Sequence, residues 1–94
     1  MGLSQANAEI IAVQVLEWIV ANDELLPVFL GSSGASIEDL REGILEPELL
    51  AAVMDFVLMD DAWVTGFAEE MGYSPTVLLQ VRGMLPGGET PNFT

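Results

Sequence analysis

Two adjacent aspartates, Asp60 and Asp61, are the first candidates for chemistry in the sequence, because they interrupt the otherwise apolar stretch MDDAWV. Carboxylates can bind Mg²⁺ or Ca²⁺, and a pair of them can divide the roles of general acid and general base. A metal site needs several oxygen ligands that converge on one point. The pair is followed at once by the apolar run AWV, without the ligand spacing of a calcium-binding loop. We therefore predict no metal ligand and no catalytic residue at this pair.

The chain contains no histidine and no cysteine. Without them it lacks the commonest general base, the commonest transition-metal ligand, thiolate nucleophiles and disulfides. We therefore expect a protein that is not an enzyme and that binds no cofactor. An enzyme that uses carboxylates to hold a metal ion is the less favoured alternative, since it requires acidic side chains that converge.

The charge of the chain is strongly one-sided, with fifteen acidic residues, two arginines and no lysine, for a net charge of −13. Such a field repels phosphate backbones and anionic lipid headgroups, so we expect no direct binding of nucleic acid or of a membrane surface. A charged partner should be basic, although the acidity alone would also keep a small apolar protein in solution. An acidic mimic of nucleic acid, bound to a basic protein, is a second alternative function that only the charge supports.

The hydropathy of the chain is high for its size. The 94 residues make one domain, and 51% of them are hydrophobic, with a mean hydropathy of +0.45. A chain of this length buries only about 60 to 65% of the surface that its unfolded form exposes. Some apolar surface should therefore be exposed or covered by another chain. We expect a non-enzymatic interaction or structural protein that self-associates or binds an unidentified protein.

The location of the protein is predicted from its apolar stretches. The longest of them, residues 10–21, is too short to span a bilayer, which needs about 20 residues. No basic segment precedes an apolar one at the N-terminus, as it would in a secretory signal. The expected location is the cytoplasm.

The sequence resembles itself at an offset of 38 residues, so that residues 11–45 align with residues 49–83 without a gap. The identical pairs are Val15/Val53, Asp23/Asp61, Phe29/Phe67, Gly34/Gly72, Ser36/Ser74 and Leu40/Leu78. Self-similarity at a fixed period is typical of a repeated structural unit. It predicts two copies of one three-helix unit.

These pairs fall where helices should begin and end. Gly34 and Gly72 stand where a helix can end in a left-handed residue. Ser36 and Ser74 follow two residues later, where a hydroxyl group can cap the next helix. Two residues at the junction between the first and second helix of each copy are predicted to cap the second helix and to complement its dipole. They are Asn22 and Asp23 in the first copy, and Asp60 and Asp61 in the second.

The pattern of apolar residues predicts an all-α fold, a compact bundle of about six helices built as two three-helix repeats. The helices are expected at residues 5–21, 24–31, 37–45, 47–59, 62–71 and 75–84, within a single domain at 1–85 and before a flexible tail at 86–94. The first and fourth helices are apolar on most of their circumference, so they should form the centre. Pro27 lies in the first turn of the second helix, which should therefore start late or be distorted.

Three residues are candidates for contact with a partner. Trp63 opens a short helix and should remain partly exposed, although aromatic residues at helical spacing usually lie in a core. Met59 and Met71 would suit an adaptable apolar surface. Glu17 and Asp55 lie in the middle of apolar helices, and we expect both to face solvent.

The segments EWIVANDELLPVFLGSSGASIEDLR and EPELLAAVMDFVLMDDAWVTGFAEEMG resemble a family of short bacterial proteins known as domain-of-unknown-function family 3572. The similarity covers about residues 9–83, and its features are Asp23, Leu25, Leu26, Phe29, Gly34, Pro47, Met54, Asp55, Phe56 and Asp60. Pro27 stands where a polar residue would be expected. The resemblance implies a small all-helical cytoplasmic protein without an assigned activity, and it supplies no catalytic residues.

Overall fold

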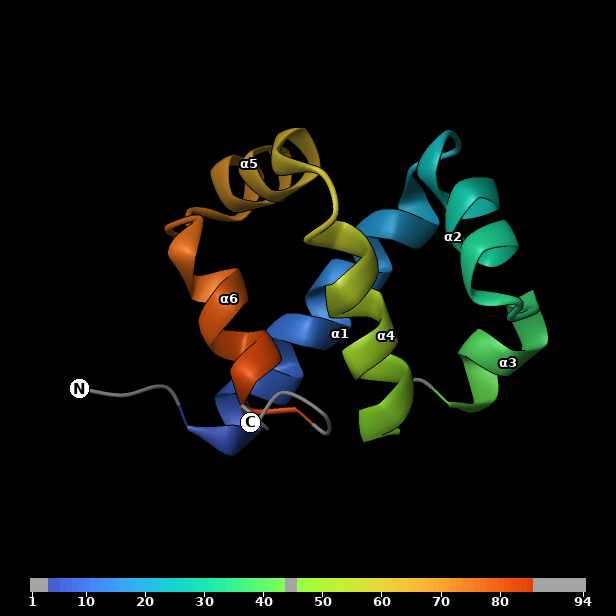
Figure 1. Ribbon diagram of the computed structural model, residues 1–94, viewed down its shortest axis with the longest axis horizontal. Coiled ribbons are helices and arrows are strands. Elements are labelled where there is room, and N and C mark those ends of the chain that lie inside the picture. Colours follow the sequence, from blue (N-terminus) through green and yellow to red (C-terminus); the bar gives the residue numbers. More distant parts are fainter. Residues whose placement is uncertain (1–3, 44–45, 86–94) are drawn as a thin grey trace, which may run out of the picture.

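Six α-helices make up the described part of the chain, residues 4–43 and 46–85 of a computed structural model (Figure 1). They are α1 (Gln5–Ala21), α2 (Leu25–Ser33), α3 (Ile37–Glu42), α4 (Pro47–Val57), α5 (Asp61–Met71) and α6 (Thr76–Gly83). No strand occurs in these residues, and the Cα radius of gyration is 12.7 Å. The predicted all-α bundle is confirmed, whereas the tail predicted at 86–94 lies outside the described residues.

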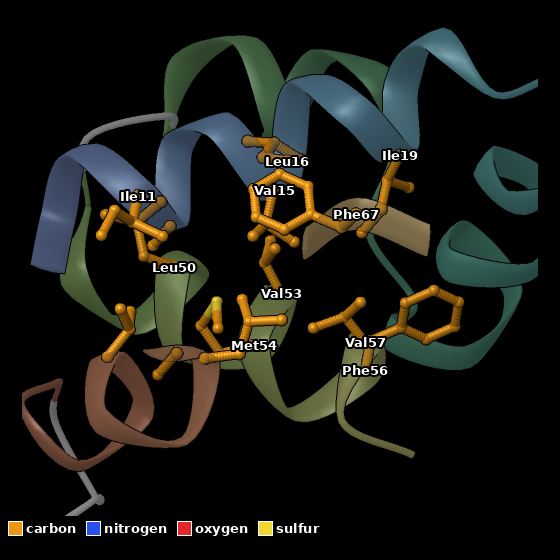
Figure 2. Close-up of a cluster of buried hydrophobic side chains, with 14 of the residues drawn as sticks. Ile11, Val15, Leu16, Ile19, Leu50, Val53, Met54, Phe56, Val57 and Phe67 are labelled. Carbon is orange, nitrogen blue, oxygen red and sulfur yellow. The ribbon is translucent and has the colours of Figure 1, made fainter. Parts of the chain in front are cut away.

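Helices α1 and α4 pack against each other at the centre of the bundle. In Figure 1, α2 and α3 lie on one side of this pair, and α5 and α6 lie on the other. Fully buried side chains recur at spacings of three or four residues on both central helices, as expected where one helical face packs on another (Figure 2). They include Ala8, Ala12, Val15, Leu16 and Ile19 on α1, and Leu50, Val53, Met54 and Val57 on α4. The predicted central position of these two helices agrees with this packing.

Two aromatic contacts join the first three helices to the last three. The ring of Trp18 on α1 meets Phe67 on α5 edge to face, with centroids 5.9 Å apart. The ring of Phe56 on α4 meets Phe29 on α2 in the same way, at 5.2 Å. The residues at 18 and 56, and those at 29 and 67, are each separated by 38 positions, so the second contact repeats the first with the two halves exchanged. The internal repeat stays a prediction, and this pair of contacts supports it.

Two helices end in left-handed glycines. Gly34 has φ 75° at the end of α2 and Gly72 has φ 79° at the end of α5, and no other described residue has a positive φ. Helix α3 then begins with a capping box, in which the Ser36 hydroxyl accepts from the Asp39 N–H and the Asp39 carboxylate accepts from the Ser36 N–H. The capping box thus pairs two of the N–H groups at the start of α3, which have no partner within the helix.

The predicted pair Asp60 and Asp61 stands at the start of α5, and the two residues have different roles there. Asp60 has an extended backbone, and its carboxylate accepts from the Ala62 N–H at 2.8 Å. Asp61 is already the first helical residue, where its charge complements the helix dipole but its side chain caps nothing. Within the predicted pair the cap is therefore Asp60, and Asp61 complements the dipole, because a capping residue needs the non-helical backbone that Asp60 has.

The corresponding cap before α2 belongs to Asn22. Its side-chain oxygen accepts from the N–H groups of Glu24 and Leu25 at 2.9 and 3.2 Å. Asp23 lies in the turn that follows and makes no side-chain hydrogen bond within the described residues. Of the predicted pair Asn22 and Asp23, the cap is therefore Asn22.

Two other predictions about helix starts, for Ser74 and Pro27, are wrong. The Ser74 hydroxyl shares a hydrogen bond with the Thr76 hydroxyl at 3.0 Å instead of capping α6, since Pro75 already has a helical backbone. Helix α2 does not start late, because Leu26 is helical and its N–H donates to the carbonyl of Asn22 at 3.0 Å. Pro27 is the third residue of α2, where an N–H would have no partner within the helix in any case.

Candidate functional site

The acidic residues of the described segments do not gather into a metal centre. No group of three or more acidic side chains within residues 4–43 and 46–85 is arranged to hold a metal ion. Asp55 instead pairs with an arginine: its two oxygens accept from Nε and Nη2 of Arg82 at 2.5 and 3.2 Å. The Asp55 side chain is 61% exposed and that of Arg82 only 19%. The Asp55 carboxylate thus links α4 to α6 through Arg82.

The three side chains predicted to meet a partner differ in their exposure. Met59 is 70% exposed and Met71 is 40% exposed. Trp63 is half-buried, because its ring stacks on Phe56 with centroids 4.7 Å apart. Trp63 and Met71 are separated by roughly 12 Å along α5, at about 1.5 Å of rise per residue. They therefore do not converge on one spot, and their role in binding a partner stays a prediction.

An open apolar groove lies instead between α1, α2 and α3, with a volume of about 340 Å³. We call it the α1–α3 groove. Only two of its lining residues carry a charge. The lining consists of Leu16, Glu17, Val20 and Ala21 of α1, Leu26 of α2, and Ile37, Leu40 and Arg41 of α3. Leu16 and Leu40 are buried, whereas Val20 and Ile37 remain 44% and 49% exposed. The groove is therefore a hollow with a buried floor and water-exposed aliphatic sides.

The groove is open because α3 is short. This helix has six residues and buries one of them, Leu40. Helix α6, the counterpart of α3 in the predicted repeat, has eight residues and buries Leu78 and Val81, and Leu85 just beyond it is buried as well. Helix α6 also packs against both central helices. Helix α3 therefore buries less of the apolar surface of α1 than α6 buries of the two central helices.

The end of α1 next to the groove is strongly negative. Helix α1 ends at Ala21, and the last turn of a helix carries the negative end of its dipole. A second, more polar hollow shares Ala21 with the groove, and its other lining residues are Trp18, Asn22, Asp23, Glu24 and Glu70. The indole N–H of Trp18 donates to the Glu70 carboxylate at 3.1 Å. Glu17 of the groove itself is exposed and makes no ion pair within the described residues. The groove is therefore apolar inside and acidic beside α1.

Apolar surface continues along α1 toward its N-terminus. A shallow hollow on this helix includes Ile10, Val13 and Glu17, and Ile10 is 55% exposed. Glu17 lines both this hollow and the groove. Despite this surface, none of the helices in the described residues combines the length and the apolar character needed to cross a membrane.

Sequence reasoning did not identify the α1–α3 groove. The sequence does indicate uncovered apolar surface on the first helix, because this helix is apolar on more of its circumference than one neighbouring helix can cover. Which part of that surface stays open depends on how α3 packs, and this could not be read from the pattern. The predicted contact residues were chosen by side-chain type, and they lie elsewhere.

The comparison with curated proteins gave no match, and neither did the comparison with solved structures. The model of one protein family matches residues 5–88, which include all six helices. Its description is "Protein of unknown function (DUF3572)". Since the match extends over most of the 94 residues, this chain belongs to the DUF3572 family.

Proposed function

We propose that this protein is a non-enzymatic interaction module that holds another protein in the α1–α3 groove. The observation that carries the proposal is the groove itself, an open hollow of about 340 Å³ whose sides include the half-exposed Val20 and Ile37. Apolar concavities rimmed by polar groups are typical of binding sites. Burying the two aliphatic side chains under a partner would remove apolar surface from water, which is the main driving force of association.

The chemistry of the chain favours binding over catalysis. The sequence has no histidine and no cysteine, and the groove carries only Glu17 and Arg41 as ionisable groups. A groove of this composition offers apolar contact and two charges that can orient a partner. It offers no nucleophile that an adjacent base activates.

Self-association is a narrower form of the same proposal, in which the partner is a second copy. The exposed apolar residues would allow it, but each copy carries a net charge of −13. Two such copies repel each other at low salt. We therefore favour a different protein as the partner. The oligomeric state is measured by light scattering to test the alternative.

A matched pair of variants tests the proposal by affinity capture from cells that contain this protein naturally, followed by mass spectrometry. Val20→Asn places an amide in the groove. Val28→Asn makes the same change on α2, at a valine with nearly the same exposure that does not line the groove. We expect a protein that is captured by the wild type and by Val28→Asn, and that is lost with Val20→Asn.

Two control measurements accompany the capture. Circular dichroism and thermal melting establish that both variants are folded, and light scattering after size exclusion gives the mass of each. A protein captured equally by all three chains would contradict binding in the groove. A wild-type dimer that Val20→Asn converts to a monomer would assign the groove to self-association.

A further inference from the structure

We propose that the α1–α3 groove binds an amphipathic helix of another protein, one that inserts apolar side chains between α1 and α3 and pairs an arginine or lysine with Glu17. This inference rests on the proposed function and specifies the chemistry of the partner.

The pairing of Asp55 with Arg82 indicates what Glu17 is suited to bind. Glu17 and Asp55 are 38 residues apart and hold the same position in the two predicted copies. Asp55 on α4 binds the guanidinium of Arg82 through two hydrogen bonds, although Asp55 itself is largely exposed. Glu17 on α1 makes no ion pair within the described residues. An arginine of a partner helix would give Glu17 the contact that Arg82 gives Asp55.

The apolar side of α6 indicates what the partner helix should insert. Leu78 and Val81 of α6 are buried at positions i and i+3, and Leu85, just beyond the end of the helix, is buried as well. The i, i+3 spacing is one by which a helix places anchors in a groove. Among the described residues 34–43 only Leu40 is buried, and the positions matching Val81 and Leu85 are Gly43 and Pro47. A partner helix would supply the apolar side chains that α3 lacks.

The charge around the groove selects a basic helix over an acidic one and over a second copy of this chain. Glu17 lies on the α1 wall, and Asp23, Glu24 and Glu70 lie just beyond the end of α1. A second copy would bring another net charge of −13, and one of its two arginines is held by Asp55. Arg41 lies on the α3 wall. The basic residues of the partner should therefore face α1.

The size of the groove agrees with a few side chains of a helix. Its volume of about 340 Å³ is near the lower end of the range for sites that enclose small molecules, roughly 300 to 1,000 Å³. The groove is also open to solvent, with Val20 and Ile37 about half exposed. A surface of this form offers contact along one side of a helix, which is the groove mode of peptide recognition.

The test uses a synthetic fluorescent peptide of about 18 residues, which makes about five helical turns. The peptide carries leucines at i, i+3 and i+7 and arginine at i+4, on an alanine and glutamine background. A scrambled peptide of the same composition keeps the charge but has no apolar side. Binding to the full chain is followed by fluorescence anisotropy at physiological salt, where nonspecific attraction is screened within about 8 Å.

Two matched pairs of variants separate docking from general attraction. Glu17→Gln removes the carboxylate of the groove, and Glu69→Gln removes another exposed carboxylate, on α5, so both variants have the same net charge. Val20→Asn and Val28→Asn are the second pair. We expect Glu17→Gln and Val20→Asn to weaken binding on the order of tenfold, which corresponds to about 1.4 kcal/mol. We expect Glu69→Gln and Val28→Asn to change it less than twofold.

Nuclear magnetic resonance provides a second readout that does not depend on a variant being folded. Titration with the peptide should shift backbone amide signals within residues 16–21 and 37–41, the two segments that contain most of the groove lining. The signals of α6, which lies on the other side of the central helices (Figure 1), should remain in place. Shifts confined to α6, or spread evenly over the acidic surface, would overturn the proposal.

The outcomes distinguish this inference from the proposed function. Equal weakening by Glu17→Gln and Glu69→Gln, or equal binding of the scrambled peptide, means nonspecific attraction and overturns the basic-helix inference alone. If a protein is still captured in a manner sensitive to Val20→Asn, the groove is a binding site for a partner of other chemistry. If neither capture nor peptide binding responds to Val20→Asn, both proposals fail.

Discussion

At the scale of single residues, the two aspartates in MDDAWV have different structural roles. Asp60 accepts the N–H of Ala62, and Asp61 contributes only its charge to the first turn of α5. The sequence allowed the prediction of a capped junction at this place. It did not allow the choice between neighbours, because the capping residue is decided by which of the two has an extended backbone.

Replacing Asp60 by alanine should lower the free energy of unfolding by about 1 kcal/mol, the usual cost of losing such a cap. Asp61→Ala should cost clearly less, because its side chain makes no capping hydrogen bond. Urea denaturation of the two variants and the wild type measures the difference. An Asp61→Ala variant that is the less stable of the two would contradict the assignment.

The pair Asp55–Arg82 should contribute little to stability, despite its two hydrogen bonds. Because Asp55 is 61% exposed, solvent screens the charge, and such pairs are typically worth about 0.2 to 1 kcal/mol. A double-mutant cycle with Asp55→Asn and Arg82→Gln measures the coupling free energy between the two side chains. We expect a value within that range that decreases as salt is added. A larger coupling that is insensitive to salt would show that the pair is less solvated than its exposure indicates.

At the scale of elements, the sequence predicted the helices better than their ends. The bounds of α1 were predicted without error at 5–21, since its apolar pattern is long and unbroken. Helix α3 was predicted to reach residue 45 but ends at Glu42, where the N–H of Gly43 closes the last turn on the carbonyl of Asp39. The end of a short helix depends on one or two hydrogen bonds, and these leave no periodic signal.

Substitution of alanine for two glycines near the end of α2 should change the stability of the protein in opposite directions. Gly34 has φ 75°, so Gly34→Ala forces an L-residue into a left-handed conformation and should cost about 1 kcal/mol or more. Gly31 lies within the helix, and a Cβ there would meet nothing within 4 Å. Gly31→Ala should therefore stabilise the protein by about 0.5 to 1 kcal/mol. Thermal and urea unfolding test both signs, and a destabilised Gly31→Ala variant would contradict the open surroundings described for it.

At the scale of the whole molecule, the all-α bundle and its central pair of helices could be predicted from apolar periodicity. The α1–α3 groove could not be, because it arises from the mismatch between a widely apolar α1 and a short α3. Neither helix shows this mismatch alone. The predicted partner residues Trp63, Met59 and Met71 were selected by type, whereas a concave surface depends on which residues the fold brings together.

The net charge of −13 should make stability depend on salt. Raising the ionic strength from about 0.01 to about 0.15 M shortens the Debye length from about 30 to about 8 Å, so repulsion within the folded chain falls. We expect the melting temperature to rise with NaCl over this range. Magnesium chloride at matched ionic strength should have a similar effect. A much larger effect of magnesium would indicate a divalent-cation site and contradict the prediction that the chain binds no metal.

The position of Trp18 has a consequence for fluorescence. Its ring contacts Phe67 and its indole N–H binds Glu70, both on α5, so its emission reports on the junction between the two halves of the chain. Trp63 stacks on Phe56 within the second half and reports on the surroundings of that ring. Variants with a single tryptophan, Trp63→Phe and Trp18→Phe, therefore provide two separate optical probes. Because α1 and α4 share one core, each variant should give the same urea midpoint by its emission as by circular dichroism. An emission change of Trp18 that precedes the loss of helix would show that the halves separate before they unfold.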